Sequence, residues 1–304
     1  MTISVLIPVY NHAAELVACI QSLQHQTCAP MEVIVVDDGS TDAPEAALEA
    51  AGLRDHVRWI SLGRNQGAPV ARNTGFAASA GEVVIFLDAD AVLRPDALAM
   101  LRDAVLADPT AAFAYSAFAF GGKTFRSQPF SVEALAQGNY IHTSALIRRG
   151  AFVGFDPALT KFQDWDLWIR IAQQGGRGVY VPELLMQMKE RSQGGMSRWL
   201  PAFAYRLPWA WIGWKPEPVQ RYERARDVLF AKHKEWRRAA LEKTSPSVIS
   251  TRAWLAVILS FALLSASVIG TPLGGAAAVC VALAVGIAAI VDPRLALGWM
   301  ACEL

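Results

Sequence analysis

Short apolar segments alternate with helical patterns along residues 3–90, and this alternation restricts the possible folds more than any other feature of the sequence. Strands that are apolar throughout are typical of a parallel sheet covered on both faces, and their alternation with helices is typical of α/β proteins. We therefore predict a Rossmann-like α/β fold, with a mostly parallel central sheet flanked by helices. The predicted strands are Ile3–Pro8, Glu32–Val36, Val57–Ser61 and Glu82–Leu87, and the predicted helices end near Gln26 and span Ala43–Ala51 and Ala68–Ala80.

The periodic pattern weakens after a predicted helix at Leu101–Leu106. Two later apolar segments, Phe113–Phe120 and Ala145–Arg148, are expected as strands at the edge of the same sheet. The segment Asp164–Gln173 has apolar residues at helical spacing, and the glycine pair that follows it is a typical helix end. We therefore expect a helix there.

A long uncharged stretch lies near the end of the chain, from Ala253 to Val291. Gly270–Gly275 interrupts it, so each side offers about 18 residues, or about 27 Å of helix, enough to span a bilayer. Arg252 and Arg294 flank the stretch, and by the positive-inside rule both ends then lie in the cytoplasm. We expect a two-span anchor in a bacterial inner membrane, with the domain that precedes it in the cytoplasm; a buried hydrophobic hairpin is the alternative.

The segment before this stretch is rich in tryptophan and basic residues. Six of the ten tryptophans fall between Trp199 and Trp254, and a basic helical pattern covers Arg221–Lys243. Such a composition is typical of a bilayer interface, although a tryptophan-rich core under a solvated helix would look similar. The expected domains are therefore 1–205 for the catalytic body, 206–251 for an interfacial helical segment, and 252–304 for the transmembrane hairpin and a short tail.

The overall charge excludes one class of partner. Twenty-eight basic residues against 27 acidic residues give a net charge of +1, so no nucleic-acid partner is expected. The four cysteines have no C-x-x-C spacing, which argues against a zinc site or a disulfide framework. Nothing in the sequence indicates the oligomeric state.

Carboxylates follow two of the predicted buried strands. Asp88 and Asp90 follow one strand, and Asp37 and Asp38 follow another. Ligands of such sheets bind at the carboxyl ends of the strands. Two carboxylates one residue apart can hold a hard divalent cation that a diphosphate then helps to coordinate. The chain has no G-x-G-x-x-G motif and no P-loop, so a metal ion would have to neutralise such a diphosphate. The alternative for Asp37–Ser40 is a simple turn or helix N-cap.

Several ordered motifs carry a resemblance to a known family. They are Pro8–Asn11, Val35–Asp42, Asn65–Gly67, Ala71–Gly75, Gly81–Asp90, Gly154–Asp156 and Gln163–Arg170. Together they resemble the family 2 glycosyltransferases over about residues 1 to 190. The resemblance implies the GT-A fold and inversion at the anomeric centre of the donor sugar.

The resemblance also implies roles for the matched positions. Tyr10 and Asp38 would contact the nucleotide base, with Arg72 and Asn73 in support. Asp88 would lie near the ribose and the metal, Asp90 would be the direct ligand of Mn²⁺ or Mg²⁺, and Asp164 would be the general base. The donor-binding residues implied are Pro8, Tyr10, Asn11, Asp37, Asp38, Arg72, Asn73 and Asp88, with Arg191 or Ser197 in place of a histidine that some members carry in a loop over the diphosphate.

Four details of the sequence bear on mechanism. The family usually has Glu where this chain has Gln163, but that acid is not the base. The pattern Gln-x-x-Arg-Trp of processive synthases is not met, so processive polymerisation is not expected. Asp166 is the local alternative to Asp164, although it is more readily assigned to the helix N-terminus, where negative charge is favoured. His142 is expected as a hydrogen-bonded structural histidine, with contact to the acceptor as the alternative.

Together these features predict a membrane-anchored glycosyltransferase. It would move one sugar from a nucleotide sugar, expected to be a UDP-sugar, to a hydroxyl of a lipid-linked or cell-envelope glycan. Transfer onto a polyprenyl phosphate is an alternative, because that acceptor oxygen needs no base. A catalytically inactive sugar-nucleotide-binding scaffold of an envelope complex is another.

Overall fold

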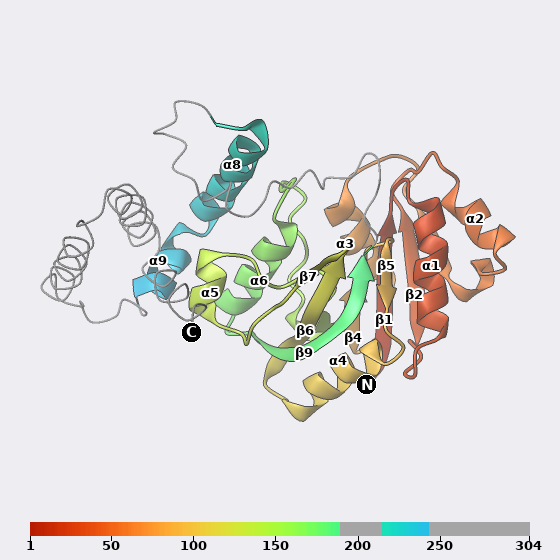
Figure 1. Ribbon diagram of the computed structural model, residues 1–304, viewed down its shortest axis with the longest axis horizontal. Helices are drawn as coiled ribbons and strands as arrows, with labels where there is room; N and C mark the ends of the chain where they lie inside the picture. Colours follow the sequence, from red (N-terminus) through yellow and green to blue (C-terminus); the bar gives the residue numbers. More distant parts are fainter. Residues whose placement is uncertain (189–214, 243–304) are drawn as a thin grey trace, which may run out of the picture. The chain divides into compact units, whose positions relative to one another are not determined.

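The computed structural model describes residues 1–188 and 215–242 of the chain, and these residues contain one nine-stranded mixed sheet with helices packed against it (Figure 1). The sheet order is β3-β2-β1-β4-β8-β6-β9-β5, and β7 pairs with β6 off this path. The strands are β1 Ile3–Val9, β2 Glu32–Asp37, β3 Arg58–Ser61, β4 Val83–Phe86, β5 Ala91–Leu93, β6 Ala111–Phe120, β7 Lys123–Phe125, β8 Leu146–Arg148 and β9 Arg177–Met188. The helices are α1 Ala13–Gln24, α2 Pro44–Ala50, α3 Ala68–Ala78, α4 Ala97–Ala107, α5 Val132–Gln137, α6 Gln163–Gln173, α8 Glu217–Lys232 and α9 Lys234–Glu242.

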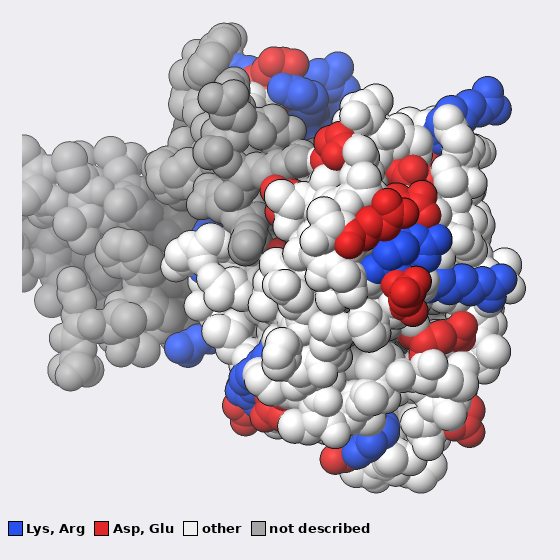
Figure 2. Space-filling model, turned by 90° about the vertical axis from the view of Figure 1, so that its right-hand side faces the viewer, with Lys and Arg blue, Asp and Glu red and all other residues white. Residues whose placement is uncertain are grey.

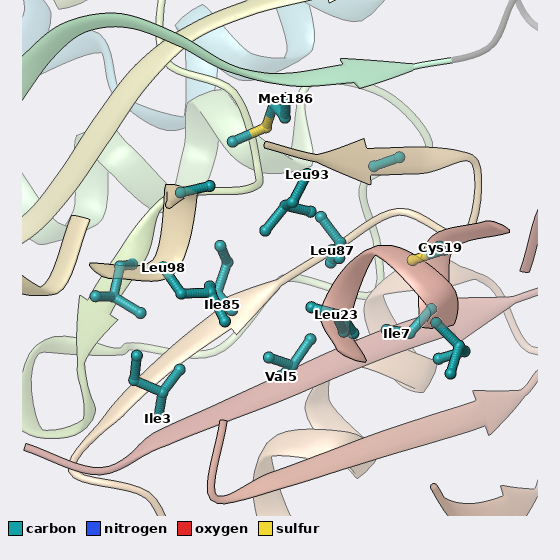
Figure 3. Packing of buried hydrophobic residues seen from close by; sticks show 14 of the residues in the cluster. Ile3, Val5, Ile7, Cys19, Leu23, Ile85, Leu87, Leu93, Leu98 and Met186 are labelled. Atoms are coloured by element: carbon teal, nitrogen blue, oxygen red, sulfur yellow. The ribbon is translucent and has the colours of Figure 1, made fainter. Parts of the chain in front are cut away.

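The predicted α/β architecture is confirmed in the first half of the sheet. β1 pairs in parallel with both β2 and β4, and β2 pairs in parallel with β3. Successive side chains of a strand point to opposite faces, so the all-apolar β1 supplies two cores at once. Val5 and Ile7 belong to the core that includes α1 and α4, whereas Leu6 belongs to the core that includes α3 and α6. Figure 3 shows the first of these cores, in which Val5 lies beside Leu23 of α1.

The expectation that Phe113–Phe120 and Ala145–Arg148 lie at a sheet edge is wrong. β8 lies between β4 and β6 and pairs antiparallel with both, and β6 pairs in parallel with the long strand β9. The sequence did not predict β9, which contains Pro182. In the β6–β9 register, Ser116 pairs with Val181 and Ala117 with Leu184, so Pro182 lies in a bulge. A proline is tolerated there because its position does not need a backbone N–H for strand pairing.

The helices α8 and α9 pack on the same body as α5 and α6. Leu229 of α8 is buried and belongs to the core that contains Trp165 and Trp168 of α6. This part of the predicted interfacial segment 206–251 therefore uses apolar side chains to cover the globular body. The predicted hairpin at 252–304 and Arg191 lie outside the described residues. Within residues 1–188 and 215–242, no helix combines the length and the apolar character needed to cross a membrane.

Figure 2 shows the side of the molecule that is on the right in Figure 1, near α1 and α2. Acidic and basic side chains lie next to one another on this face. Bands of opposite sign lie next to each other there, with apolar and neutral polar surface between them. This mixture agrees with the net charge of +1.

Candidate functional site

The carboxyl ends of β1, β2 and β4 lie at one edge of the sheet. The parallel register pairs Val9 with Asp37, and Leu6 with Phe86 two positions before Asp88. The residues that follow these strands therefore meet at this edge, as predicted for a doubly wound sheet. The ring of Tyr10 is 43% exposed there, which is unusual for a large aromatic side chain directly after a buried strand.

A turn after β2 is tied to the loop before α3. The Asp38 carboxylate is 3% exposed and accepts hydrogen bonds from the backbone N–H groups of Gln66 at 2.7 Å and Gly67 at 2.9 Å. Gly39 has φ of +77°, and a Cβ atom there would lie 2.6 Å from the backbone of Arg64. Only glycine allows the turn and the loop to approach so closely. Base recognition by Asp38 stays a prediction, while its carboxylate visibly holds the loop.

Three other predicted donor-binding residues shape the same edge. Asn11 has φ of +56°, and its side-chain oxygen accepts a hydrogen bond from the Thr41 backbone N–H at 2.8 Å. Asp37 accepts one from the Ser40 backbone N–H at 2.9 Å, so the turn that was the alternative for Asp37–Ser40 is present. Pro8 is half-buried in β1. Their contacts to a donor stay predictions.

Arg72 of α3 joins the end of β4 to the start of α6. Its guanidinium donates to the Asp88 carboxylate at 2.8 Å and to the side-chain oxygen of Gln163 at 3.0 Å. The side chain of Asn73 makes two hydrogen bonds of 2.8 Å with the backbone of Phe155. Both residues thus hold the segment before α6 against α3. The sequence analysis gave them a different role, in support of the nucleotide base, and that role stays a prediction.

Asp88 and Asp90 lie on the short connection between β4 and β5. Burial alone would raise the pKa of Asp88, but Arg72 and His142 outweigh it and keep that pKa below its ordinary value. Cys19 of α1 lies beneath both carboxylates: burial raises the pKa of its thiol, and the charges of Asp90 and Asp88 raise it further. The Cys19 thiol also lies 3.9 Å from the backbone carbonyl oxygen of Asp88.

This pair of carboxylates fits a hard divalent cation. Oxygen ligands suit Mg²⁺ or Mn²⁺, and Asp88 remains 30% exposed beside the half-buried Asp90. In the described parts of the chain, no group of three or more His, Cys, Asp and Glu side chains could hold a metal ion. Substrate oxygens and water commonly complete the coordination of Mg²⁺ at such a carboxylate pair.

Asp164 lies in the first turn of α6, on the side of the site reached by Arg72. Its carboxylate accepts a hydrogen bond from the side chain of Asn139 at 2.6 Å and one from its neighbour's backbone, Trp165 N–H, at 2.9 Å. Burial raises the pKa of Asp164, and the nearby His142 and these two donors offset only part of that effect. A carboxylate held in this way is suited to accept a proton.

His142 lies between the two acidic groups. Its Nε2 is 3.8 Å from the Asp88 carboxylate, and the charge of Asp164 also acts on the ring. The Ser144 backbone N–H donates to Nδ1 at 3.1 Å, so in the neutral ring the proton belongs on Nε2. Burial lowers the pKa of His142, although Asp88 and Asp164 oppose this effect. The predicted hydrogen bond to this histidine is confirmed, and the ring also belongs to the site.

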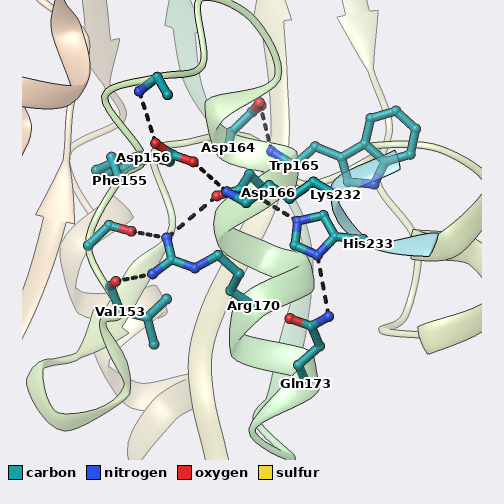
Figure 4. A network of polar contacts seen from close by, with 12 residues as sticks. Val153, Phe155, Asp156, Asp164, Trp165, Asp166, Arg170, Gln173, Lys232 and His233 are labelled. Atoms are coloured by element: carbon teal, nitrogen blue, oxygen red, sulfur yellow. Dashed lines mark hydrogen bonds and ion pairs between the residues drawn. The ribbon is translucent and has the colours of Figure 1, made fainter. Parts of the chain in front are cut away.

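Asp166 points away from Asp164 and is fully buried. A separation of two residues along an α-helix corresponds to a rotation of about 200°, so the side chains of Asp164 and Asp166 leave α6 on nearly opposite sides. Asp166 contacts Lys232 at 2.7 Å and His233 at 2.7 Å, and Arg170 lies 3.5 Å away (Figure 4). Asp166 lies in the first turn of α6, where negative charge is favoured, and its carboxylate is held there by three side chains.

The sequence analysis missed two residues of this site. Asn139 had no assigned role, and Gln163 was noted only as a departure from the family. The signal for both was available in part: Asn139 lies in the same short segment as His142, and Gln163 immediately precedes Asp164. Their partners could not be identified from local spacing, since Asn139 is 25 positions from Asp164 and Arg72 is 91 positions from Gln163.

Comparison with known proteins agrees with this arrangement. Residues 4–161 match the family model described as Glycosyl transferase family 2, which covers more than half of the chain. The chain belongs to glycosyl transferase family 2. The matched region contains β2, β4, α3 and nearly all of β1, and it ends just before α6.

Relatives of this family 2 chain include larger proteins. The O-antigen biosynthesis protein RfbC of Myxococcus xanthus is 32% identical over 213 residues, which are 64% of this chain and 16% of that protein. An uncharacterized glycosyltransferase of Haemophilus influenzae is 28% identical over 186 residues, 57% of this chain and 62% of that protein. The chain thus spans less than two thirds of the length of either relative.

Two solved structures share the fold. S. aureus TarS 1-349 in complex with UDP-GlcNAc has a TM-score of 0.55 at 19% identity, over 86% of this chain and 80% of that chain. The mannosyltransferase PcManGT of Pyrobaculum calidifontis, in complex with GDP-Man and Mn²⁺, has a TM-score of 0.50 at 23% identity, over 86% and 79%. At these identities the likeness concerns the arrangement of the sheet and helices.

Proposed function

We propose that this protein is an inverting glycosyltransferase that moves one sugar from a nucleotide sugar to a hydroxyl of a membrane-bound or cell-envelope glycan. One observation carries the proposal. Arg72 donates to Asp88, at the end of β4, and to Gln163, which precedes Asp164 at the start of α6. An acidic pair for the diphosphate thus lies beside a separate carboxylate that can take a proton.

The chain's own groups account for the transfer step. The acceptor hydroxyl oxygen bonds to the anomeric carbon on the face opposite the diphosphate, the bond from that carbon to the diphosphate oxygen breaks, and the hydroxyl proton moves to a carboxylate oxygen of Asp164. Its raised pKa makes Asp164 a stronger base than an ordinary aspartate, and the Asn139 hydrogen bond orients the carboxylate. His142, as a neutral ring, can donate from Nε2 between Asp88 and Asp164.

A divalent cation completes the donor site in this proposal. Asp88 and Asp90 would hold Mn²⁺ or Mg²⁺, and the ion, when bound, neutralises the charge of the leaving diphosphate. PcManGT, a structural neighbour, has been solved with Mn²⁺, which supports a cation here. Arg72 holds one oxygen of Asp88 and so fixes the direction of that carboxylate.

The donor and acceptor are inferred from the relatives and from the tail. TarS has been solved with UDP and UDP-GlcNAc and PcManGT with GDP-Man, and we propose a UDP-sugar. The names of RfbC and of the succinoglycan biosynthesis protein ExoO of Rhizobium meliloti favour a polysaccharide or lipid-linked acceptor. The uncharged residues 253–291 would anchor the chain in a bacterial inner membrane beside such an acceptor, with the catalytic domain in the cytoplasm.

Asp164→Asn in the full-length protein tests the proposal. Thermal shift with UDP-, GDP- and dTDP-sugars, with and without Mn²⁺, measures donor binding, and nucleoside diphosphate release measures transfer. The variant should bind the donor like the wild type and lose transfer by about 10²- to 10⁴-fold. The control is Asp55→Asn, in the short 3-10 helix Arg54–His56, where Asp55 is exposed.

Two other outcomes separate the alternatives. Full turnover by Asp164→Asn would favour a phosphate acceptor, such as a polyprenyl phosphate, over a hydroxyl. Donor binding by the wild type without transfer or hydrolysis would favour a sugar-nucleotide-binding scaffold.

A further inference from the structure

A charged cluster around the buried carboxylate of Asp166 lies behind α6, outside the proposed site, and Lys232 in this cluster keeps 33% of its side chain exposed. The carboxylate of Asp166 has no exposed surface, and Lys232 and His233 both approach the same oxygen at 2.7 Å. His233 is itself buried and contacts Gln173 at the other end of α6 at 3.3 Å. Figure 4 shows these side chains reaching α6 from the end of α8. A buried charge is stable only when it is paired, so this cluster ties α8 to the helix that carries Asp164.

Lys232 also contacts the loop that precedes α6. Its Nζ lies 2.6 Å from the carboxylate of Asp156, in the loop before α6. The neighbouring residue Phe155 is the one that Asn73 of α3 holds through two hydrogen bonds. One ammonium group therefore joins α6 to the loop that leads into it.

The same pair of helices supports the residue that binds Asp164. Arg237 of α9 donates to the Ala136 carbonyl of α5 at 2.8 Å, and α5 ends two residues before Asn139. Trp165 of α6 donates to the Leu135 carbonyl of α5 at 2.8 Å and packs edge-on against Phe230 of α8, with ring centroids 5.3 Å apart. The α8–α9 pair thus contacts both elements that hold the Asp164 carboxylate, α6 and the end of α5.

We propose that α8 and α9 act as a brace that positions Asp164, with Lys232 and Arg237 as positioning residues. The proposal rests on the proposed function, because it assigns these residues to the base of that reaction. Catalysis of proton transfer requires the base within hydrogen-bond reach of the acceptor, and displacements of about 1 Å can cost about 10²-fold in rate. Without the contacts of Lys232 or Arg237, the first turn of α6 and Asn139 could move relative to each other.

A purely structural role for α8 and α9 makes a different prediction. If these helices only cover apolar surface, a change at Lys232 would alter stability or the amount of folded protein, but not the turnover of the folded fraction. The contacts of Lys232 and Arg237 described above go to α6, the loop before it and α5, whereas the proposed donor-binding edge is built from β1, β2, β4 and α3. A positioning role therefore predicts a selective loss of kcat.

Lys232→Met and Arg237→Met in the full-length protein test the brace, with Lys232→Arg as the conservative variant and the exposed Lys234→Met as the matched control. Each methionine variant should lower kcat of transfer about tenfold or more with a change in donor KM below about twofold. Lys232→Arg should recover most of the rate and Lys234→Met should match the wild type. A kcat within about twofold of wild type for Lys232→Met, or equal losses in Lys232→Arg and Lys232→Met, would overturn the proposal.

Amide hydrogen exchange separates this proposal from the proposed function. In Lys232→Met, exchange should become faster in residues 132–141 and at the start of α6, with no change in β1 and β2. Wild-type exchange in those segments would overturn the brace whatever the activity is. If the wild-type protein transfers no sugar while exchange responds as expected, the proposed function fails and the mechanical coupling stands.

Discussion

The guanidinium of Arg72 lies 2.8 Å from the carboxylate of Asp88, and Arg72 thereby connects the carboxyl end of β4 to the start of α6. The same guanidinium donates to Gln163, next to Asp164, and stacks over the ring of Phe155 with 5.2 Å to its centroid. Arg72 is almost completely buried, so its charge depends on Asp88 for compensation. The two halves of the site therefore share one cation supplied by the protein.

Arg72→Met should destabilise the protein and reduce activity. The substitution leaves Asp88 without its main partner, which should cost about 2 kcal/mol of unfolding free energy, because Asp88 retains some access to water. Thermal unfolding of the full-length protein measures the loss. Arg221→Met, which breaks an exposed ion pair with Glu217, should change stability by less than about 1 kcal/mol. Equal effects of the two substitutions would contradict the assignment of Arg72.

Asn139→Ala should move the pH dependence of transfer. Transfer requires the ionised form of Asp164, so the rate rises with pH through its pKa, which burial already raises above the ordinary value. Asn139 donates to the charged carboxylate and lowers that pKa, so its removal should shift the acidic limb of the kcat profile to higher pH. The rate at neutral pH should fall about tenfold.

The control for Asn139→Ala is Gln24→Ala, at the exposed end of α1. That variant should keep the wild-type profile. An acidic limb that stays in place in Asn139→Ala, or moves to lower pH, would show that Asn139 does not act on the base.

Asp166→Asn should lower stability in a pH-dependent way. His233 and Lys232 outweigh burial and hold the pKa of Asp166 below its ordinary value of 3.8. A lowered pKa in the folded state contributes stability above the unfolded-state value, and this contribution is lost as the pH falls from that value through the folded-state pKa. The variant should be less stable than the wild type by about 2 kcal/mol at neutral pH, and the difference should shrink below pH 3.8.

Unfolding midpoints of wild type and Asp166→Asn between pH 7 and pH 3 measure this effect. The difference between the two proteins reports on Asp166 together with Asp156, whose pKa the charge of Asp166 raises. A difference that grows as the solution is acidified would have the wrong sign for a carboxylate held by cations.

Gly39→Ala should weaken donor binding. A Cβ atom at this position would lie 2.6 Å from the Arg64 backbone, so the loop that Asp38 holds through Gln66 and Gly67 must move. We expect the donor Kd to rise about tenfold, since that loop forms part of the donor edge. Gly63→Ala is the matched control: Gly63 also has a positive φ, +71°, but no atom lies within 4 Å of its added Cβ. If both variants weaken binding equally, backbone strain rather than the close approach is the cause.

Local sequence patterns were sufficient for the first half of the fold. The predicted strands and helices between Ile3 and Phe86 agree with β1–β4 and α1–α3 to within a few residues, because apolar runs and helical spacing are properties of neighbouring residues. The same reasoning placed Asp37, Asp38 and Asp88 at one edge, since the carboxyl ends of parallel strands always meet there. The second half required pairings that spacing does not reveal, such as β8 between β4 and β6.

Residue type and strand order in the sequence indicated which carboxylates could hold a cation, whereas Asp164 was predicted as the base from the resemblance of Gln163–Arg170 to the family 2 glycosyltransferases. Tertiary packing decided what each carboxylate contacts. Asp164 and Asp166 are separated by a single residue. Asp164 contacts Asn139 and is affected by the charge of His142, whereas Asp166 contacts Lys232 and His233. His233 is 67 positions away from Asp166 in the sequence. The side chains of Asp164 and Asp166 leave α6 about 200° apart. The elements packed on each side of the helix therefore determine which carboxylate can meet a substrate and which one is enclosed by cationic side chains.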